Sequence, residues 1–174
     1  NKGLALATGD VVGFLHADDT YADARVLERV AGAFADPAVG AVYGDLDYVW
    51  NARPDRVARS WRSRPFERSL LKAGWMPPHP TLYVRRSFYE RVGGFDLRYR
   101  IAADYHSVLR LFSEADLNPV HLPEVLVRMR TGGASNRSLG NIVQKSREDL
   151  DALRRTGHGG VLTLLRKNLS KVGQ

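Results

Sequence analysis

Two adjacent carboxylates, Asp18 and Asp19, directly follow a short apolar run, Val11–Leu15. A buried strand that ends in polar residues brings them to the rim of a parallel sheet, where open α/β folds bind ligands. Neighbouring carboxylates repel each other, and a hard cation such as Mg²⁺ or Mn²⁺ removes that repulsion while leaving positions for phosphate oxygens. The pattern therefore indicates a site for a metal ion and a diphosphate. Alternatively, the two acids begin the next helix, since Asp is a good N-terminal cap.

Two further polar residues lie in positions that could serve the same site. Val39–Asp45 is predicted to be a second buried strand, and a helix over 24–34 separates it from the first. A strand–helix–strand unit implies parallel pairing with a right-handed crossover, so Asp45 either faces a substrate near the acidic pair or belongs to an ordinary turn. His79 lies in a proline-rich loop, Gly74–Pro80, where it could orient a hydroxyl, contact a phosphate oxygen or simply pack.

Asp104 begins a helix, and a glycine-containing loop follows later in the chain. The helix has an apolar face made of Tyr105, Val108, Leu109 and Phe112. An Asp at a helix start is usually a cap. In the loop Thr131–Arg137, glycine amides together with Arg128, Arg130 or Arg137 could cradle a diphosphate, or the loop could be a solvated basic segment.

The chain resembles a family 2 glycosyltransferase of the GT-A fold through landmarks that occur in the family's order. They are Asn1–Asp10 with the following His16-Ala17-Asp18-Asp19, then His79–Arg86, Val92–Asp96 and Ala103–Tyr105. The resemblance implies an α/β, Rossmann-like mixed sheet flanked by helices, with further helices at the C-terminus. It also implies strand–helix units before Asn1 that hold the nucleotide base and ribose. We therefore expect a chain truncated at its N-terminus, which leaves the activity of this chain alone open.

The resemblance also implies roles for individual residues. Asp18 would bind the metal. His16 stands where many relatives have the first Asp of a D-x-D motif, so the first metal ligand would be either the imidazole of His16 or absent. Asp104 occupies the place of the family's general base, and a helix start favours the ionised carboxylate that a base needs. The substrate-binding residues would be Asp19, Asp45, His79 and Arg137.

The implied reaction is inverting transfer of a sugar from a nucleotide-sugar donor to a sugar or lipid-linked acceptor, in polysaccharide or glycolipid synthesis. The Q-x-x-R-W signature of processive synthases and their membrane spans are absent from the sequence, which favours a single transfer. Two alternatives stay open. One is a metal-dependent nucleotidyltransferase, and the other is a non-catalytic basic scaffold or membrane-surface module.

Composition and charge narrow the class of protein. The 174 residues are 44% hydrophobic and 26% charged, as in a globular domain, and they include no cysteine, which is compatible with the cytoplasm. The net charge is +7, of which residues 124–174 contribute +6. No nucleic-acid motif accompanies these cations, so we expect no nucleic-acid partner. We predict a catalytic core over 1–137 and a basic helical extension over 138–174.

The segment 160–174 is amphipathic. One helical face carries Leu162, Leu165, Leu169 and Val172, and the predicted flanking cations are Arg166, Lys167 and Lys171. Such a helix either lies on an anionic membrane surface or packs on the protein's own body through the same apolar face. The first possibility predicts peripheral association with the inner face of a membrane.

Overall fold

The computed structural model describes residues 1–131 and 139–169, which form two compact units. The sheet unit contains Asn1–Phe66, Pro77–Gly93 and Ala115–Thr131. The helical unit contains Glu67–Met76, Gly94–Glu114 and the described residues after 138. The chain passes between the units several times, and the domain boundary expected after residue 137 remains a prediction.

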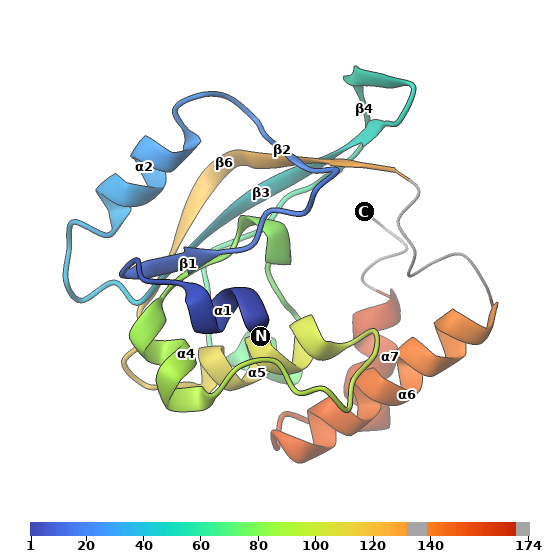
Figure 1. The fold of residues 1–174 in the computed structure, drawn as a ribbon. Helices are drawn as coiled ribbons and strands as arrows, with labels where there is room; N and C mark the ends of the chain where they lie inside the picture. Colours follow the sequence, from blue (N-terminus) through green and yellow to red (C-terminus); the bar gives the residue numbers. More distant parts are fainter. Residues whose placement is uncertain (132–138, 170–174) are drawn as a thin grey trace. The chain divides into compact units, whose positions relative to one another are not determined.

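The sheet unit is built on six strands in the order β1-β5-β3-β6-β2, with β4 paired to β3 (Figure 1). β3 and β6 are parallel, and the other neighbouring strands are antiparallel. The sheet is therefore mixed, which confirms the expected α/β class. The strands span β1 Val11–Gly13, β2 Thr20–Tyr21, β3 Ala41–Trp50, β4 Arg53–Trp61, β5 Tyr83–Arg85 and β6 Pro119–Arg130.

The predicted parallel pairing between the first two buried strands is wrong, because β5 lies between them. Val84 of β5 is opposite Val12 on one side and opposite Ala41 on the other. The side chain of Val84 is completely buried, so this later strand takes the central place that the local pattern assigned to its neighbours. The sequence pattern also predicts two short strands, at 119–122 and 125–129, where the structure has one continuous strand, β6.

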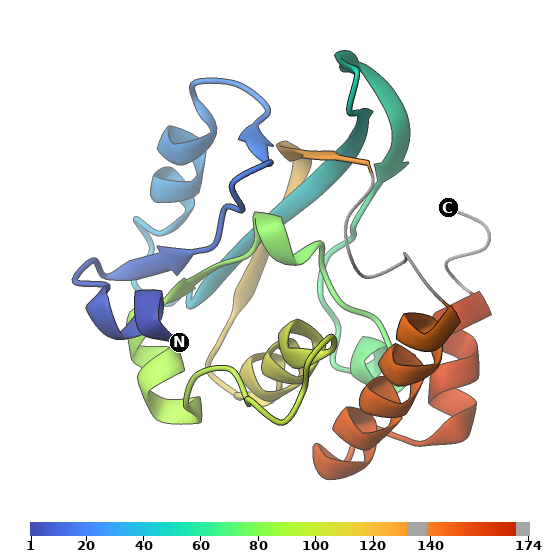
Figure 2. The same ribbon diagram turned by 45° about the vertical axis from the view of Figure 1, so that its right-hand side comes forward.

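One helix, α2 (Val26–Ala33), covers a face of the sheet, as both views show (Figures 1 and 2). Its buried residues Val26 and Val30 are four positions apart and pack in one cluster with Val42, Leu46 and Leu126 of the strands. The remaining helical segments of this unit are α1 Lys2–Leu6, η1 His79–Thr81 and α4 Arg86–Val92. Gly93 ends α4 with a φ of 78°, a backbone conformation that favours glycine.

The helical unit consists of α3 Ser69–Lys72, α5 Ala103–Ser113, α6 Leu139–Arg155 and α7 Val161–Leu169. The predicted apolar face of α5 is buried, and Trp75 packs edge-on against Phe112 with ring centroids 5.8 Å apart. From α6, Ala152 and Leu153 are fully buried. None of the helices described is long and apolar enough to cross a membrane.

The orientation of α7 corrects one expectation. Lys167, predicted to flank the apolar face, is only 2% exposed, and its Nζ lies 2.9 Å from Oδ2 of the equally buried Asp149. Lys167 Nζ also lies 3.0 Å from the centroid of the Tyr105 ring. An ion pair therefore decides which face of α7 turns inward, while Leu162 and Leu169 are 75% and 71% exposed. Val172 and Lys171 lie outside the described residues.

Candidate active site

The acidic turn between β1 and β2 separates its two carboxylates. Asp18 is exposed, whereas Asp19 is 6% exposed. The N–H of Asp19 donates to the carbonyl of His16 (3.1 Å), and Thr20 then pairs with Arg128 of β6. Asp18 lies in the turn itself, and Asp19 is the residue directly before β2. Asp18 is thus open to solvent, whereas Asp19 is turned inward.

Neither carboxylate oxygen of Asp19 has a hydrogen-bond partner within the residues the structure describes. Burial raises the pKa of Asp19, His16 opposes this effect, and the charge of Asp18 adds to it. A buried carboxylate normally acquires a donor or a cation. The acidic turn is therefore suited to a positively charged or hydrogen-bonding ligand.

Two histidines meet beside this turn. The Nε2 atoms of His16 and His79 are 3.3 Å apart, and the ring centroids are 5.5 Å apart. Thr81 anchors the loop that carries His79, because its hydroxyl oxygen lies 2.8 Å from the Pro78 carbonyl and 2.9 Å from the Gly44 carbonyl of β3. In this contact one imidazole donates and the other accepts, according to the tautomers of the two rings. The structure thus brings two predicted site residues together.

Asp45 has internal partners instead. Its side chain accepts a hydrogen bond from the Ser63 N–H (2.8 Å) and lies 3.3 Å from Nε2 of His121, whose ring stacks on Tyr43. Arg62 approaches the same carboxylate at 3.8 Å. These contacts fasten β3 to the segment after β4, so the substrate-binding role of Asp45 remains a prediction. No local sequence pattern singles out His121 or Arg62, because their contacts with Asp45 depend on segments that are distant along the chain.

Asp104 lies in the first turn of α5, in the helical unit. It is the second residue of the helix, and Ala102 occupies the N-cap position. Its Oδ1 accepts a hydrogen bond from the N–H of Tyr105 at 2.7 Å. The expected position at the helix start is therefore correct to within two residues, but Asp104 is not the cap.

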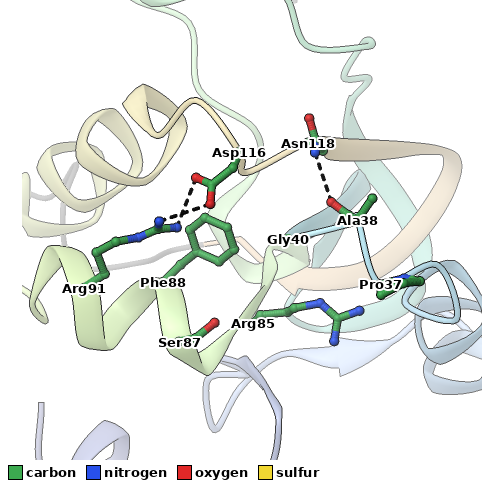
Figure 3. Close-up of a pocket in the computed structure, with 9 residues that line it drawn as sticks. All are labelled: Pro37, Ala38, Gly40, Arg85, Ser87, Phe88, Arg91, Asp116 and Asn118. Atoms are coloured by element: carbon green, nitrogen blue, oxygen red, sulfur yellow. Dashed lines mark hydrogen bonds and ion pairs between the residues drawn. The ribbon is translucent and has the colours of Figure 1, made fainter.

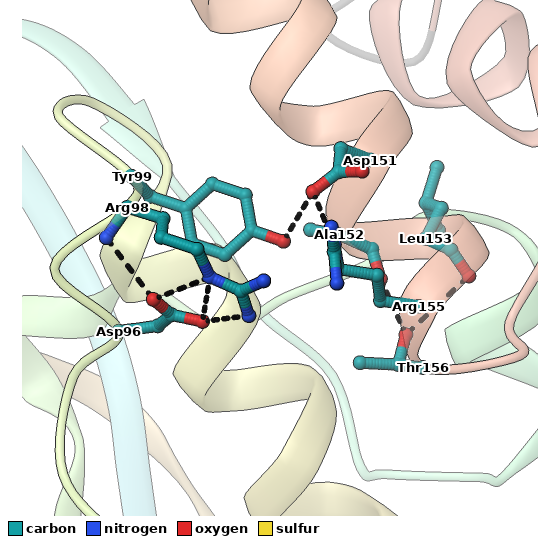
Figure 4. Close-up of polar contacts among 8 residues, drawn as sticks. All are labelled: Asp96, Arg98, Tyr99, Asp151, Ala152, Leu153, Arg155 and Thr156. Carbon is teal, nitrogen blue, oxygen red and sulfur yellow. Dashed lines mark hydrogen bonds and ion pairs between the residues drawn. The ribbon is translucent and has the colours of Figure 1, made fainter.

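The loop before α5 is fixed to α6 by a polar network that the sequence did not indicate (Figure 4). The Tyr99 hydroxyl donates to Asp151 at 2.8 Å, and burial together with this bond raises the pKa of Tyr99 to about 12. Asp151 also accepts a bond from Arg155. In the same loop, Asp96 is held by Arg98, which lowers the pKa of Asp96. The segment leading to Asp104 is thus ordered by side chains.

The donor atoms at the acidic turn fit a metal ion that is shared with a phosphate. In the part of the chain that is described, no three His, Cys, Asp or Glu side chains form a group that could hold a metal ion. Mg²⁺ in nucleotide sites is commonly bound by one or two carboxylates and completed by phosphate oxygens and water. Asp18, with His16 as a second donor on the same turn, matches that mode. Arg137, also predicted for this site, lies outside the described residues.

A separate surface hollow of about 570 Å³ lies at the amino ends of β3 and β6 (Figure 3). The Arg91–Asp116 ion pair forms part of its wall, and Asn118 donates to the Ala38 carbonyl. The guanidinium of Arg85 donates to the carbonyls of Val39 and Phe34. The residues that line it are Pro37, Ala38, Gly40, Arg85, Ser87, Phe88, Arg91, Asp116 and Asn118, so no predicted site residue contributes.

Comparison with known families and proteins gives consistent matches. Residues 1–113 match the model of glycosyl transferase family 2. An uncharacterized glycosyltransferase of Mycobacterium tuberculosis is 30% identical over 92% of this chain and 60% of its own length. A PGL/p-HBAD biosynthesis glycosyltransferase of Mycobacterium bovis is 31% identical over 78% of this chain and 51% of its own length. The chain thus spans roughly half to three-fifths of these relatives.

Solved structures match the fold at lower sequence identity. A mannosyltransferase from Pyrobaculum calidifontis, in complex with GDP-Man and Mn²⁺, has a TM-score of 0.57 and 19% identity. The match covers 96% of this chain and 46% of that one. TarS of S. aureus in complex with UDP-GlcNAc has a TM-score of 0.55 and 15% identity, covering 88% and 45%. The sheet and its helices therefore have the architecture of these enzymes.

Proposed function

The chain belongs to glycosyl transferase family 2, and from this premise we propose that it transfers a sugar from a nucleotide-diphosphate donor to an acceptor hydroxyl. The proposed transfer inverts the anomeric centre, uses a divalent metal ion and serves the synthesis of a cell-surface polysaccharide or glycolipid. The observation that carries the proposal is the exposed carboxylate of Asp18 in the same turn as His16, next to His79. The relatives named for PGL/p-HBAD biosynthesis support the acceptor class.

In the proposed mechanism Asp104 removes the proton from the acceptor hydroxyl as its oxygen attacks the anomeric carbon. One base and one displacement give inversion, and no carboxylate nucleophile is required. Asp18 and His16 would hold the metal ion, which when bound neutralises charge on the leaving diphosphate. His79 is suited to donate a hydrogen bond to a phosphate oxygen or to the acceptor, because its ring is held by the anchored η1 segment.

We expect Asp18→Asn to weaken metal-dependent donor binding at least tenfold, because the neutral amide cannot offset the charge of the cation. Isothermal calorimetry of the whole protein with UDP-GlcNAc and GDP-mannose, each with Mn²⁺ and with EDTA, measures this difference. Asp10→Asn is the matched control, since Asp10 is also exposed and precedes the same strand, β1. Equal binding by Asp18→Asn and the wild type in Mn²⁺ would remove Asp18 from the metal site.

We also propose that α7 places the protein on an anionic membrane surface. Val161, Leu162, Leu165 and Leu169 are exposed on one side of the helix, and Thr163 and Lys167 are buried on the other. The alternative of packing on the protein through the leucine face does not match this orientation. Within its described residues α7 carries the exposed cation Arg166 and no acid, which suits anionic head groups. With the predicted cytoplasmic location, this favours the inner face of a membrane.

Replacing Leu162, Leu165 and Leu169 together by Ser should reduce binding to vesicles of equal phosphatidylglycerol and phosphatidylcholine more than tenfold. Each buried leucine contributes about 1.5–3 kcal/mol. Co-sedimentation at low salt measures the loss, and high salt should weaken wild-type binding. Leu6→Ser and Leu97→Ser are controls, because these leucines are at least as exposed but lie on other elements. Unchanged binding of the triple variant, or no binding by the wild type, would refute the membrane proposal.

A further inference from the structure

One side chain from α6 binds the backbone N–H groups directly before α5. The carboxylate of Glu148 accepts hydrogen bonds from three successive backbone N–H groups, those of Arg100, Ile101 and Ala102. The N···O distances are 3.2, 2.7 and 2.9 Å in that order. Ala102 is the N-cap residue of α5 and provides no side-chain cap of its own. Glu148, 46 positions beyond Ala102 in the sequence, therefore fixes the backbone that leads into α5, whereas a local cap would accept from the second or third N–H of the helix itself.

Electrostatics strengthens this contact. The first N–H groups of a helix carry a partial positive charge, which favours a carboxylate in front of them. Partial burial acts to raise the pKa of Glu148, but the N–H groups of Ala102 and Ile101 and the side-chain amide of Gln144 outweigh it and lower the pKa. Gln144 lies one turn earlier on α6 and donates to Oε1 at 2.9 Å. Glu148 is thus ionised at neutral pH and fixed in orientation.

The first turn of α5 is held on its other side too. Tyr105 lies under the ammonium group of Lys167, which is itself paired with Asp149 of α6. Asp104 lies between Ala102, whose N–H binds Glu148, and Tyr105. The carboxylate of Asp104 accepts a hydrogen bond from the N–H of Tyr105. A shift of this turn would therefore move the Asp104 carboxylate with it.

We infer that Glu148 is a positioning residue for Asp104, which it fixes by binding the backbone N–H groups at the start of α5. The inference depends on the proposed function, in which Asp104 is the general base. A base displaced by about 1 Å can lose on the order of 10²-fold in rate. Glu148 touches neither reacting atom in this scheme, so its loss should lower kcat and leave KM nearly unchanged.

The test compares Glu148→Ala, Glu148→Gln and a control, Asp151→Asn, in the whole protein. Asp151 lies on the same helix and binds the Tyr99 hydroxyl. Asn at this position keeps an oxygen that accepts this bond, so the control preserves the loop contact and leaves the hydrogen bonds between Glu148 and residues 100–102 in place. Hydrogen exchange should be at least tenfold faster at residues 100–102 in Glu148→Ala, intermediate in Glu148→Gln, and within about twofold of the wild type in Asp151→Asn. Unchanged exchange in Glu148→Ala would overturn the inference.

Turnover distinguishes positioning from general loosening of the fold. Release of nucleoside diphosphate from UDP-GlcNAc or GDP-mannose should fall roughly 10- to 100-fold in Glu148→Ala, and by less than about twofold when Asp104→Asn is already present. An equal loss in both backgrounds would overturn the inference, because Glu148 would then act independently of Asp104. If Asp104→Asn by itself keeps full turnover, the proposed base is wrong, while hydrogen exchange still reports whether Glu148 holds the helix start.

Discussion

Asp104→Asn should lower turnover by about 10²–10⁴-fold, the range expected when a general base is removed. The amide has the same shape as the carboxylate, and its oxygen can still accept the N–H of Tyr105. The free energy of unfolding should therefore change by less than about 1 kcal/mol. Release of nucleoside diphosphate from UDP-GlcNAc and GDP-mannose measures turnover, and urea unfolding followed by circular dichroism measures stability.

Glu28→Gln is the matched control for this substitution. Glu28 is the acid in the first turn of α2 and is exposed, so its change removes a helix-start charge without touching the proposed site. It should leave turnover unchanged. Full release of nucleoside diphosphate by Asp104→Asn would remove Asp104 as the base. The nucleotidyltransferase alternative predicts instead that the wild type releases no nucleoside diphosphate, because that reaction transfers the nucleotide. An unfolded Asp104→Asn protein would show that the residue serves the helix instead.

Asp149→Ala should destabilise the protein by about 3–5 kcal/mol, since removing one partner of a buried ion pair leaves the other charge uncompensated. Asp149 Oδ2 forms an ion pair with Lys167 Nζ at 2.9 Å and accepts a hydrogen bond from Lys145 Nζ at 2.7 Å, and Lys167 is almost fully buried. Lys167→Met should reduce the free energy of unfolding less than Asp149→Ala does, because Lys145 still compensates the charge of Asp149. Urea unfolding, extrapolated to water, gives each free energy.

Two further variants separate the effect of burial on the free energy of unfolding from the effect of ion pairing alone. Arg155→Ala breaks an equally short ion pair with Asp151, but both side chains are about half exposed, so the loss should be within about 1 kcal/mol. The double substitution Asp149→Leu with Lys167→Met should recover most of the stability lost in Asp149→Ala, because no buried charge remains. A loss below 1 kcal/mol in Asp149→Ala would contradict this account of how α7 is fixed.

The local features of the fold could be predicted from the sequence. The amphipathic spacing of α2 and α5 and the glycine at the end of α4 are set by residues within a few positions of one another. The same holds for the acidic turn after the first strand, since an apolar run followed by two acids is a local pattern. For this reason Asp18 and Asp104 could be placed on their elements before any contact was known.

The sequence by itself determined which segments are strands and helices and which of them carry carboxylates, because propensity and periodicity depend on near neighbours. Only the tertiary structure decided that β5 separates β1 from β3, that Asp19 is buried while Asp18 is exposed, and that Glu148 closes α5. It also turned Lys167 inward and the leucines of α7 outward, through the ion pair with Asp149. Each of these outcomes depends on partners that are distant along the chain, and residue spacing carries no information about which distant partner a side chain meets.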